Sequence, residues 1–183
     1  MRLWLARHAR VATGEGLCYG RLDLAADVHE TERAARDLAP VLPAGVRLLT
    51  SPLRRCLQLA QALTGLRPDL AAEMQPRLAE MDFGAWEGRA WSAISRDELD
   101  AWTADFGRYR AGGSGESASA FVARVAAQLD DSRRGGEDQV WVTHAGVFKA
   151  VTLCRDGLGL KAATDWPVHA LACGSWHLFD LPA

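Results

Sequence analysis

The sequence predicts an α/β fold built on a mostly parallel sheet. Short apolar runs of strand length, at residues 3–6, 46–50 and 140–143, alternate with longer segments that have helical spacing. This alternation is typical of parallel strands that are connected through helices. The chain has 183 residues, a length that suits one domain, so we expect a single domain over residues 1–183.

The composition is that of a globular protein. Hydrophobic residues make up 49% of the chain, charged residues make up 24%, and the net charge is −2. With this slightly negative net charge, the sequence gives no sign of the excess of basic residues that would favour nucleic acid or a membrane surface as a partner. No apolar run approaches the roughly 20 residues of a membrane span. The first apolar run is broken by Arg7 and Arg10, well short of a secretory core segment, so we expect a cytoplasmic protein.

The four cysteines are scattered along the chain and show no CxxC spacing. They are Cys18, Cys56, Cys154 and Cys173. This pattern fits neither a zinc site nor a disulfide framework, and it predicts reduced thiols.

A long loop is expected after the first strand, over residues 10–26. Loops of this length inside a compact domain are usually functional or disordered, and this one is too apolar for disorder. We therefore expect it to pack over the functional site. Asp27 and Glu30 have the spacing of a capping box that opens a helix over residues 28–42.

The second predicted strand leads into Ser51-Pro52, which is a cap residue followed by proline at the first helical position. This pair predicts a helix that runs to about residue 64. Further along, we expect a weak strand over 70–74, an irregular segment over 78–88, an interrupted helix over 90–106, a glycine-rich loop tip over 111–115, a helix over 117–129, a helix over 145–153 and a closing strand over 176–181.

Two of the predicted strands end in histidine. The first strand is followed by Arg7-His8, and the strand at 140–143 is followed by His144. The carboxyl ends of parallel strands meet at one edge of a sheet, so the fold can bring the two imidazoles together. A single histidine after a strand is more often a hydrogen-bonded structural residue, but the pair favours a functional site.

The segment that follows the strand at 46–50 adds an arginine to the same edge. A helix N-terminus at this place offers free backbone donors, and Arg55, one turn into the helix, can reach the same anion. The alternative is a solvated arginine on the helix surface. Together, the three strand ends predict a pocket for a dianionic phosphoryl group.

Acidic residues lie among aromatic residues over 78–88. A carboxyl group held against apolar neighbours tends to have a raised pKa, which suits a general acid for an alkoxide leaving group. Glu80, Asp82 and Glu87 are all candidates, and the residues alone do not choose among them. For each of them the alternative is a surface carboxylate or a helix cap.

Five segments in this order resemble those of the histidine phosphatase superfamily, in its phosphoglycerate mutase-like branch. They are Arg7-His8, Ser51–Arg55, Leu78–Gly88, Gly115–Ser117 and Val142–Gly146. The resemblance covers nearly the whole chain and implies a three-layer α/β/α sandwich with a mostly parallel central sheet. The loop over 16–23 and the Asp-Phe-Gly-x-Trp-Glu-Gly segment are most similar to α-ribazole phosphatase-type members.

The resemblance implies a role for each matching residue. His8 would be the nucleophile that becomes phosphohistidine, and Glu80 would be the proton donor. The phosphoryl oxygens would be held by Arg7, Arg55 and His144. The implied activity is that of a histidine acid-type phosphatase, a phosphomonoester hydrolase that needs no metal or cofactor. Its substrate would be a small metabolite or nucleotide-like phosphate, with α-ribazole 5'-phosphate as the specific suggestion, and members of the family are often homodimers.

The chain departs from the family pattern at two places. Ala9 stands where the family usually has glycine, and it would be strained if that position needed a positive φ angle. Arg10 and the region of Gly14 replace a common polar pattern after the first histidine. Arg10, Tyr19 and Arg21 are therefore candidates for substrate contacts, with structural ion pairs and packing as the alternative.

Two other functions stay open. Phosphoglycerate mutase-type phosphotransferases generally have a longer insertion between the Glu80 and His144 motifs, so the compact chain favours hydrolysis. A non-catalytic phosphate-binding protein is the second alternative, and Ala9 is the only feature that points to it. The chain has no P-loop, no GxSxG segment and no cysteine followed six positions later by arginine, so other phosphate and hydrolase chemistries find no support. The tryptophans at 86, 91 and 102 are expected in the core.

Overall fold

A five-stranded sheet forms the centre of the protein in the computed structural model, which describes residues 1–12, 15–160 and 162–181. The strands are β1 (Arg2–Arg7), β2 (Arg47–Thr50), β3 (Ala72–Met74), β4 (Gln139–Thr143) and β5 (Trp176–Asp180). Their order is β3-β2-β4-β1-β5. The first four strands are parallel, and β5 runs antiparallel to β1. The predicted α/β class with a mostly parallel sheet is confirmed.

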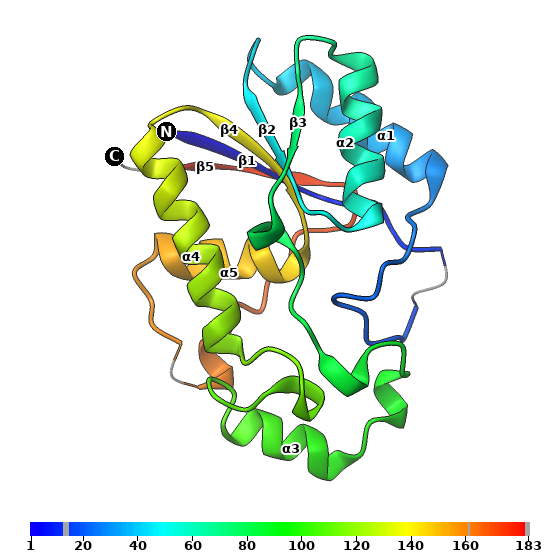
Figure 1. Cartoon of the computed structure of the whole chain (residues 1–183), viewed down its shortest axis with the longest axis vertical. Helices are drawn as coiled ribbons and strands as arrows, with labels where there is room; N and C mark the ends of the chain where they lie inside the picture. Colours follow the sequence, from blue (N-terminus) through cyan, green and yellow to red (C-terminus); the bar gives the residue numbers. More distant parts are fainter. Residues whose placement is uncertain (13–14, 161, 182–183) are drawn as a thin grey trace.

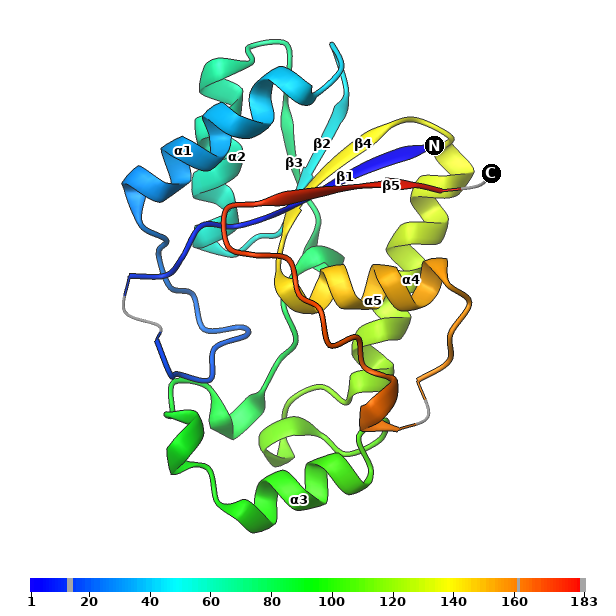
Figure 2. The same cartoon turned by 180° about the vertical axis from the view of Figure 1, so that it is seen from behind.

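Helices cover both faces of the sheet (Figures 1 and 2). One face carries α1 (Val28–Leu38) and α2 (Arg54–Leu66), and the other carries α4 (Ala118–Gly135) and α5 (Ala145–Arg155). The expected three-layer sandwich is therefore present. None of the helices in the described part of the chain is long and apolar enough to cross a bilayer.

The alternation of side chains along β1 explains the two apolar cores. Leu3 and Leu5 pack into the core beneath α4 and α5, whereas Trp4 and Ala6 pack into the core beneath α1 and α2. Successive side chains of a strand point to opposite faces, so a strand covered on both sides reads as a continuous apolar run. This is the run that marks β1 in the sequence.

The carboxyl ends of three strands lie side by side. Arg7 is paired with Thr143 in the register of β1 and β4, and Thr50 is paired with Val142 in the register of β2 and β4. The residues that follow these strands therefore start from neighbouring positions at one edge of the sheet. This register positions the site.

Beyond that edge lies a smaller lobe, drawn at the bottom of Figure 1, around α3 (Arg96–Ala104). Ser95 and Glu98 form a reciprocal capping box at the start of α3. Trp86 is fully buried, as expected, and Trp102 is partly buried against the same core. The expectation is wrong for Trp91, which is 36% exposed.

The start of α2 needs correction, and the capping box at α1, which begins at Val28 as expected, is only half formed. The helix α2 begins at Arg54, after Leu53 in an extended conformation and without a side-chain cap. Ser51 lies two positions before the N-cap; its hydroxyl accepts from Leu53 N at 3.3 Å and lies 2.8 Å from His144 Nε2. At α1, the Asp27 carboxylate accepts from Glu30 N, but Glu30 pairs with Arg10 instead of completing the box.

Two helix ends differ from the prediction by a turn or more, whereas α5 agrees with its predicted range to within two residues. The helix α1 ends four residues before the expected end and continues as a short 3₁₀ turn, Ala39–Val41. The helix α4 is longer than expected and ends at Gly136, which adopts a left-handed conformation. Its start agrees with the prediction, because Ser117 caps it through Ala120 N. Gly14 lies outside the described residues.

Candidate active site

His8 lies directly after β1 and is almost completely buried. Its Nδ1 atom lies 2.7 Å from the carbonyl oxygen of Ala9. A carbonyl can only accept a hydrogen bond, so Nδ1 carries the proton and Nε2 keeps a free lone pair. Burial lowers the pKa of His8 to about 3, and the positive charges of Arg55 and Arg7 act in the same direction. At neutral pH, His8 is therefore an uncharged imidazole that can act as a nucleophile.

His144 is the residue between β4 and α5, and it is fully buried. Its ring lies edge-on to that of His8, with 5.2 Å between the ring centroids. Burial holds the pKa of His144 well below its usual value, and the positive charge of Arg55 adds to this effect. The sheet thus brings together two imidazoles that are far apart in the sequence.

Two guanidinium groups, those of Arg7 and Arg55, lie close enough to His8 for their positive charges to lower its pKa. Arg55 is fully buried and donates from Nη1 to the carbonyl of Leu22 (2.9 Å) and from Nη2 to that of Gly20 (2.6 Å). Arg7 donates from Nη1 to the carbonyl of Leu171 (2.6 Å). In both arginines the Nε–H group is buried and has no hydrogen-bond partner among the described residues.

Glu80 lies on the other side of the site, against the start of α5. Its Oε2 accepts from Gly146 N and its Oε1 accepts from Met81 N, both at 3.0 Å. A Cβ atom on residue 146 would lie 2.2 Å from Glu80 Oε1, so any other residue at this position would displace the Glu80 carboxylate. Glu80 and Arg7 line the same cavity, which has a volume of about 340 Å³.

The other two candidate carboxylates have structural partners. Asp82 accepts from Gly84 N at 2.8 Å and thereby stabilises a turn. Glu87 accepts hydrogen bonds from four backbone N–H groups, those of Gly20, Arg21, Leu22 and Phe83, at 2.8–3.1 Å. The geometry therefore singles out Glu80 as the carboxylate at the cavity.

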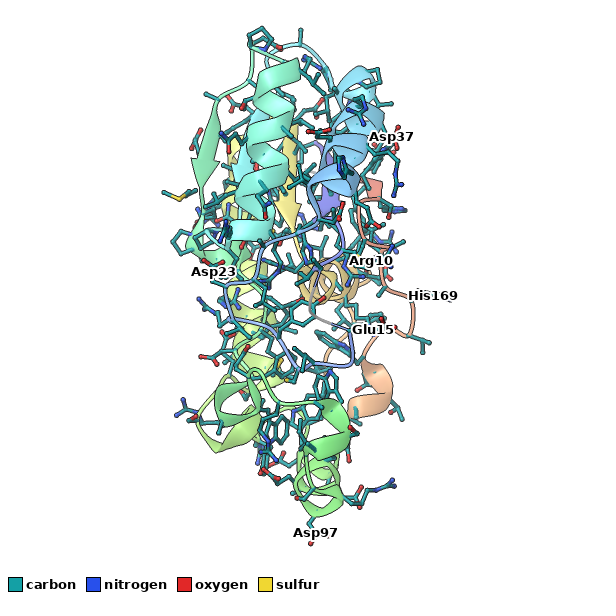
Figure 3. All side chains as sticks on the ribbon, turned by 90° about the vertical axis from the view of Figure 1, so that its right-hand side faces the viewer. Arg10, Glu15, Asp23, Asp37, Asp97 and His169 are labelled. Carbon is teal, nitrogen blue, oxygen red and sulfur yellow. The ribbon has the colours of Figure 1, made fainter. Side chains whose placement is uncertain are left out.

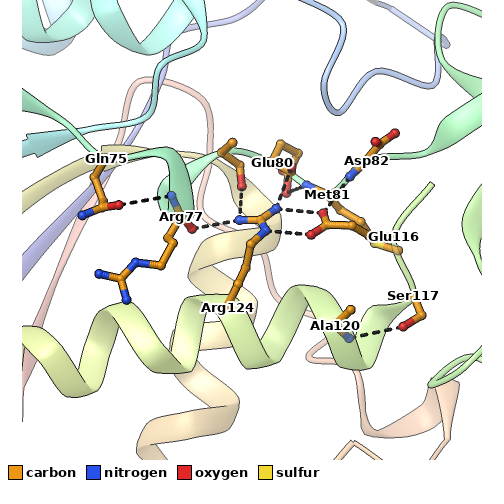
Figure 4. Close-up of polar contacts among 10 residues, drawn as sticks. Gln75, Arg77, Glu80, Met81, Asp82, Glu116, Ser117, Ala120 and Arg124 are labelled. Carbon is orange, nitrogen blue, oxygen red and sulfur yellow. Dashed lines mark hydrogen bonds and ion pairs between the residues drawn. The ribbon is translucent and has the colours of Figure 1, made fainter.

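Arg124 on α4 holds the backbone around Glu80 (Figure 4). Its guanidinium donates to the carbonyl oxygens of Arg77, Ala79 and Glu80 at 2.8–3.0 Å. It also forms two hydrogen bonds with the Glu116 carboxylate, at 2.7 and 2.8 Å. Sequence reasoning missed Arg124, although an arginine between two buried apolar residues of an amphipathic helix is an available signal.

The three candidate substrate contacts of the first loop have different surroundings. Arg10 is exposed, at 72% of its side-chain surface, and pairs with Glu30; its position on the outside is visible in Figure 3. The guanidinium of Arg55 lies 5.4 Å from the centre of the Tyr19 ring. Arg21 is exposed, and its backbone N–H binds Glu87. A contact between these side chains and a substrate stays a prediction.

Ala9 is compatible with the backbone. It is fully buried, and every described residue other than glycine has a negative φ angle. The strain considered for a positive φ angle at this position therefore does not arise.

Over the described ranges, no group of three or more His, Cys, Asp or Glu side chains is arranged to hold a metal ion. The charged groups that surround His8 are the two guanidiniums of Arg7 and Arg55.

The profile of the histidine phosphatase superfamily (branch 1) matches residues 3–180. No curated protein sequence matches the chain. Among solved structures, the protein TTHB049 from Thermus thermophilus is 31% identical and has a TM-score of 0.73, covering 100% of this chain and 95% of the other.

Two further structures share the fold at lower identity. A mycobacterial glucosyl-3-phosphoglycerate phosphatase is 24% identical with a TM-score of 0.80, covering 97% of this chain and 91% of the other. An Escherichia coli K-12 protein, provisionally named an α-ribazole-5'-P phosphatase, is 24% identical with a TM-score of 0.81, covering 97% of this chain and 89% of the other.

Proposed function

Because the chain belongs to the histidine phosphatase superfamily (branch 1), we propose that it hydrolyses phosphomonoesters through a phosphohistidine on His8. The observation that carries this proposal is the pair of buried Nε–H groups of Arg7 and Arg55, which have no partner in the described part of the chain. A buried donor without an acceptor costs about 1–3 kcal/mol. The oxygens of a phosphoryl group would supply the acceptors beside a neutral imidazole.

In the first half of the reaction, the phosphoryl oxygens accept hydrogen bonds from Arg7 and Arg55. His8 Nε2 attacks phosphorus with its lone pair, and the bond between phosphorus and the leaving oxygen breaks. Glu80 gives its proton to that oxygen, so the alcohol leaves uncharged. His144 adds a second imidazole beside the phosphoryl group.

In the second half, the Glu80 carboxylate takes a proton from water, and the water oxygen attacks phosphorus. The bond between phosphorus and His8 Nε2 breaks, which releases inorganic phosphate and restores neutral His8 and protonated Glu80. Phosphoryl transfer depends mainly on positioning and on stabilising charge. Two guanidiniums and a second imidazole can supply both, so metal independence is part of the proposal.

The proposed substrate is a small metabolite or nucleotide-like phosphate, and α-ribazole 5'-phosphate is the first compound to test. It is suggested by the loop over 16–23 and by the name of the Escherichia coli relative. The cytoplasmic location, the homodimer and the absence of nucleic-acid and membrane partners stay predictions.

The test is hydrolysis of p-nitrophenyl phosphate in EDTA across about pH 5 to 8, with the wild type beside His8→Ala and His29→Ala. His29 is an exposed histidine on α1 and serves as the control. We expect turnover by the wild type and by His29→Ala, none by His8→Ala, and an acid-labile phosphoryl adduct on the wild type after a rapid quench.

Activity that survives His8→Ala would overturn the mechanism. A folded wild type that turns over nothing, yet gains thermal stability from vanadate, would instead support a phosphate-binding protein.

A further inference from the structure

The cavity beside Glu80 has an aromatic wall. Four rings follow one another around it, those of Phe83, Trp102, Phe106 and Trp166. The centroid distances between successive rings are 6.3, 5.1 and 5.8 Å. Three of the rings come from the smaller lobe, and Trp166 comes from the segment that follows α5. A flat apolar group would find packing partners along this wall.

Three charged side chains line the cavity, and two of them belong to the proposed reaction. Arg7 donates to the Leu171 carbonyl, and Glu80 accepts from Gly146 N and Met81 N. The third is Lys149, which no step of the mechanism uses.

Lys149 lies half-buried in this aromatic surrounding. Its ammonium group is 5.9 Å from the centre of the Trp166 ring. No carboxylate of the described residues lies within ion-pair distance of it, as the salt bridges of residues 1–12, 15–160 and 162–181 include none with Lys149. Burial lowers its pKa although the nearby charge of Glu80 favours the ammonium form. A half-buried cation without a counter-ion is a place for an anion.

Trp102, which belongs to the aromatic wall, has a buried donor without a partner among the described residues. The indole Nε1 of Trp102 is buried and, over the described ranges, has no hydrogen-bond acceptor. Trp86, whose ring packs against that of Trp102, does have one, since its Nε1 donates to Glu98 at 2.9 Å. Of these two packed tryptophans, Trp102 is therefore the one whose indole N–H group lacks an acceptor in the described part of the chain.

We propose that the leaving group of the substrate is a flat apolar ring that carries a carboxylate, held by Lys149. This inference rests on the proposed phosphatase activity and names a substrate class that differs from α-ribazole 5'-phosphate, which carries no carboxylate. The placement supports it: Gly146, whose N–H binds Glu80, and Lys149 are three residues apart on α5 and therefore lie on the same side of the helix, and Lys149 and Glu80 line one cavity. A ring in this cavity can thus present its ester oxygen to Glu80 and its carboxylate to Lys149.

The first experiment compares two substrates of the same shape, 4-carboxyphenyl phosphate and its neutral analogue 4-carbamoylphenyl phosphate. We expect a KM at least about tenfold lower for the carboxylate with the wild type. Lys149→Met should remove this preference while leaving kcat/KM for the neutral analogue within about twofold. Arg155→Met, which removes another cation of α5, is the control and should keep the preference.

The second experiment measures binding without turnover. The method is isothermal titration with the two products, 4-hydroxybenzoate and 4-hydroxybenzamide. The wild type should bind 4-hydroxybenzoate more tightly than 4-hydroxybenzamide, and Lys149→Met should bind the two equally. Equal KM values for the two phosphates would overturn the inference and leave the phosphatase intact. If the protein hydrolyses neither phosphate, the proposed function is overturned. The titration then tests the inference by itself, and equal binding of the two products would overturn the inference as well.

Discussion

The Glu87 carboxylate and the Arg55 guanidinium bind the same short segment of chain. Glu87 accepts from the N–H groups of Gly20, Arg21 and Leu22, and Arg55 donates to the carbonyls of Gly20 and Leu22. The segment is fixed from both sides, and there is no room for a side chain at Gly20, where a Cβ atom would lie 1.8 Å from the Met81 carbonyl. Glu87 therefore positions Arg55 without touching the reacting atoms.

Glu87→Gln should weaken substrate binding through Arg55. The amide has one acceptor oxygen in place of two, so part of the set of four N–H groups loses its partner. We expect a KM for p-nitrophenyl phosphate raised by about tenfold and a free energy of unfolding lowered by about 1–3 kcal/mol. Glu73→Gln is the control, because Glu73 forms an exposed ion pair with Arg47, which contributes about 0–1 kcal/mol. A destabilised Glu87→Gln protein with an unchanged KM would mean that Glu87 stabilises the fold but does not position Arg55 for substrate binding.

Glu80→Gln should affect substrates according to their leaving group. An alkoxide needs a proton to depart, whereas p-nitrophenolate does not. We expect kcat/KM to fall by about 100-fold or more for an alkyl phosphate and by much less for p-nitrophenyl phosphate. The measurement is kcat/KM, because it reports the steps up to the phosphohistidine. Equal losses for the two substrates would contradict the role of Glu80 as the acid.

Gly146→Ala tests the contact between α5 and Glu80. The new Cβ atom would meet Glu80 Oε1 at 2.2 Å and displace the carboxylate. In a helix, alanine is more stable than glycine by up to about 1 kcal/mol, so the free energy of unfolding should change little while kcat/KM falls about tenfold or more. Gly135→Ala, at the open end of α4, has nothing within 4 Å of its Cβ atom and should keep full activity. Full activity of Gly146→Ala would show that the Glu80 position is not needed.

The two buried histidines should make stability depend on pH. His8 has a pKa of about 3 in the folded protein against 6.5 for the free group, and the pKa of His144 is lowered as well. The unfolded chain therefore binds more protons below about pH 7, so their contribution is complete above 6.5 and is lost as the pH falls toward 3. For His8 alone, the free energy of unfolding should drop by roughly 2 kcal/mol between pH 7 and pH 5.

Urea unfolding in phosphate-free buffer at the two pH values measures this drop. His8→Gln should reduce the pH dependence, and His29→Gln, at an exposed position on α1, should leave it unchanged. The same slope in His8→Gln as in the wild type would mean that His8 is not buried in the neutral form.

The strands and the two histidines could be predicted because they follow from local patterns. Continuous apolar runs mark buried strands, and parallel strands end at one edge, so His8 and His144 had to meet. The role of Glu87 could not be predicted, since its partners are backbone N–H groups that carry no sequence signal. For Arg124, the position among buried apolar residues of α4 was an available signal, but its three carbonyl acceptors could not be predicted.

Some local patterns were overruled by tertiary partners. Ser51 has the signature of a helix cap, but α2 begins only at Arg54, and the Ser51 hydroxyl lies between Leu53 N and His144 Nε2. Glu30 has the spacing of a capping box, but Arg10 binds its carboxylate. The choice of Glu80 among three carboxylates needed the family resemblance, because the contacts that distinguish it come from α5, 66 residues further along the chain.

The groups proposed for the reaction lie at the ends of sheet strands or in the first turn of α2, or are held in place by α4 and α5, whereas most of the aromatic wall belongs to the lobe around α3. The two parts are therefore separable under mutation. Substitutions at Phe83, Trp102 or Phe106 can reshape the space for a leaving group and leave His8, Arg7 and Arg55 in their places. A scaffold of this kind can acquire new substrates over evolutionary time while it conserves a single reaction.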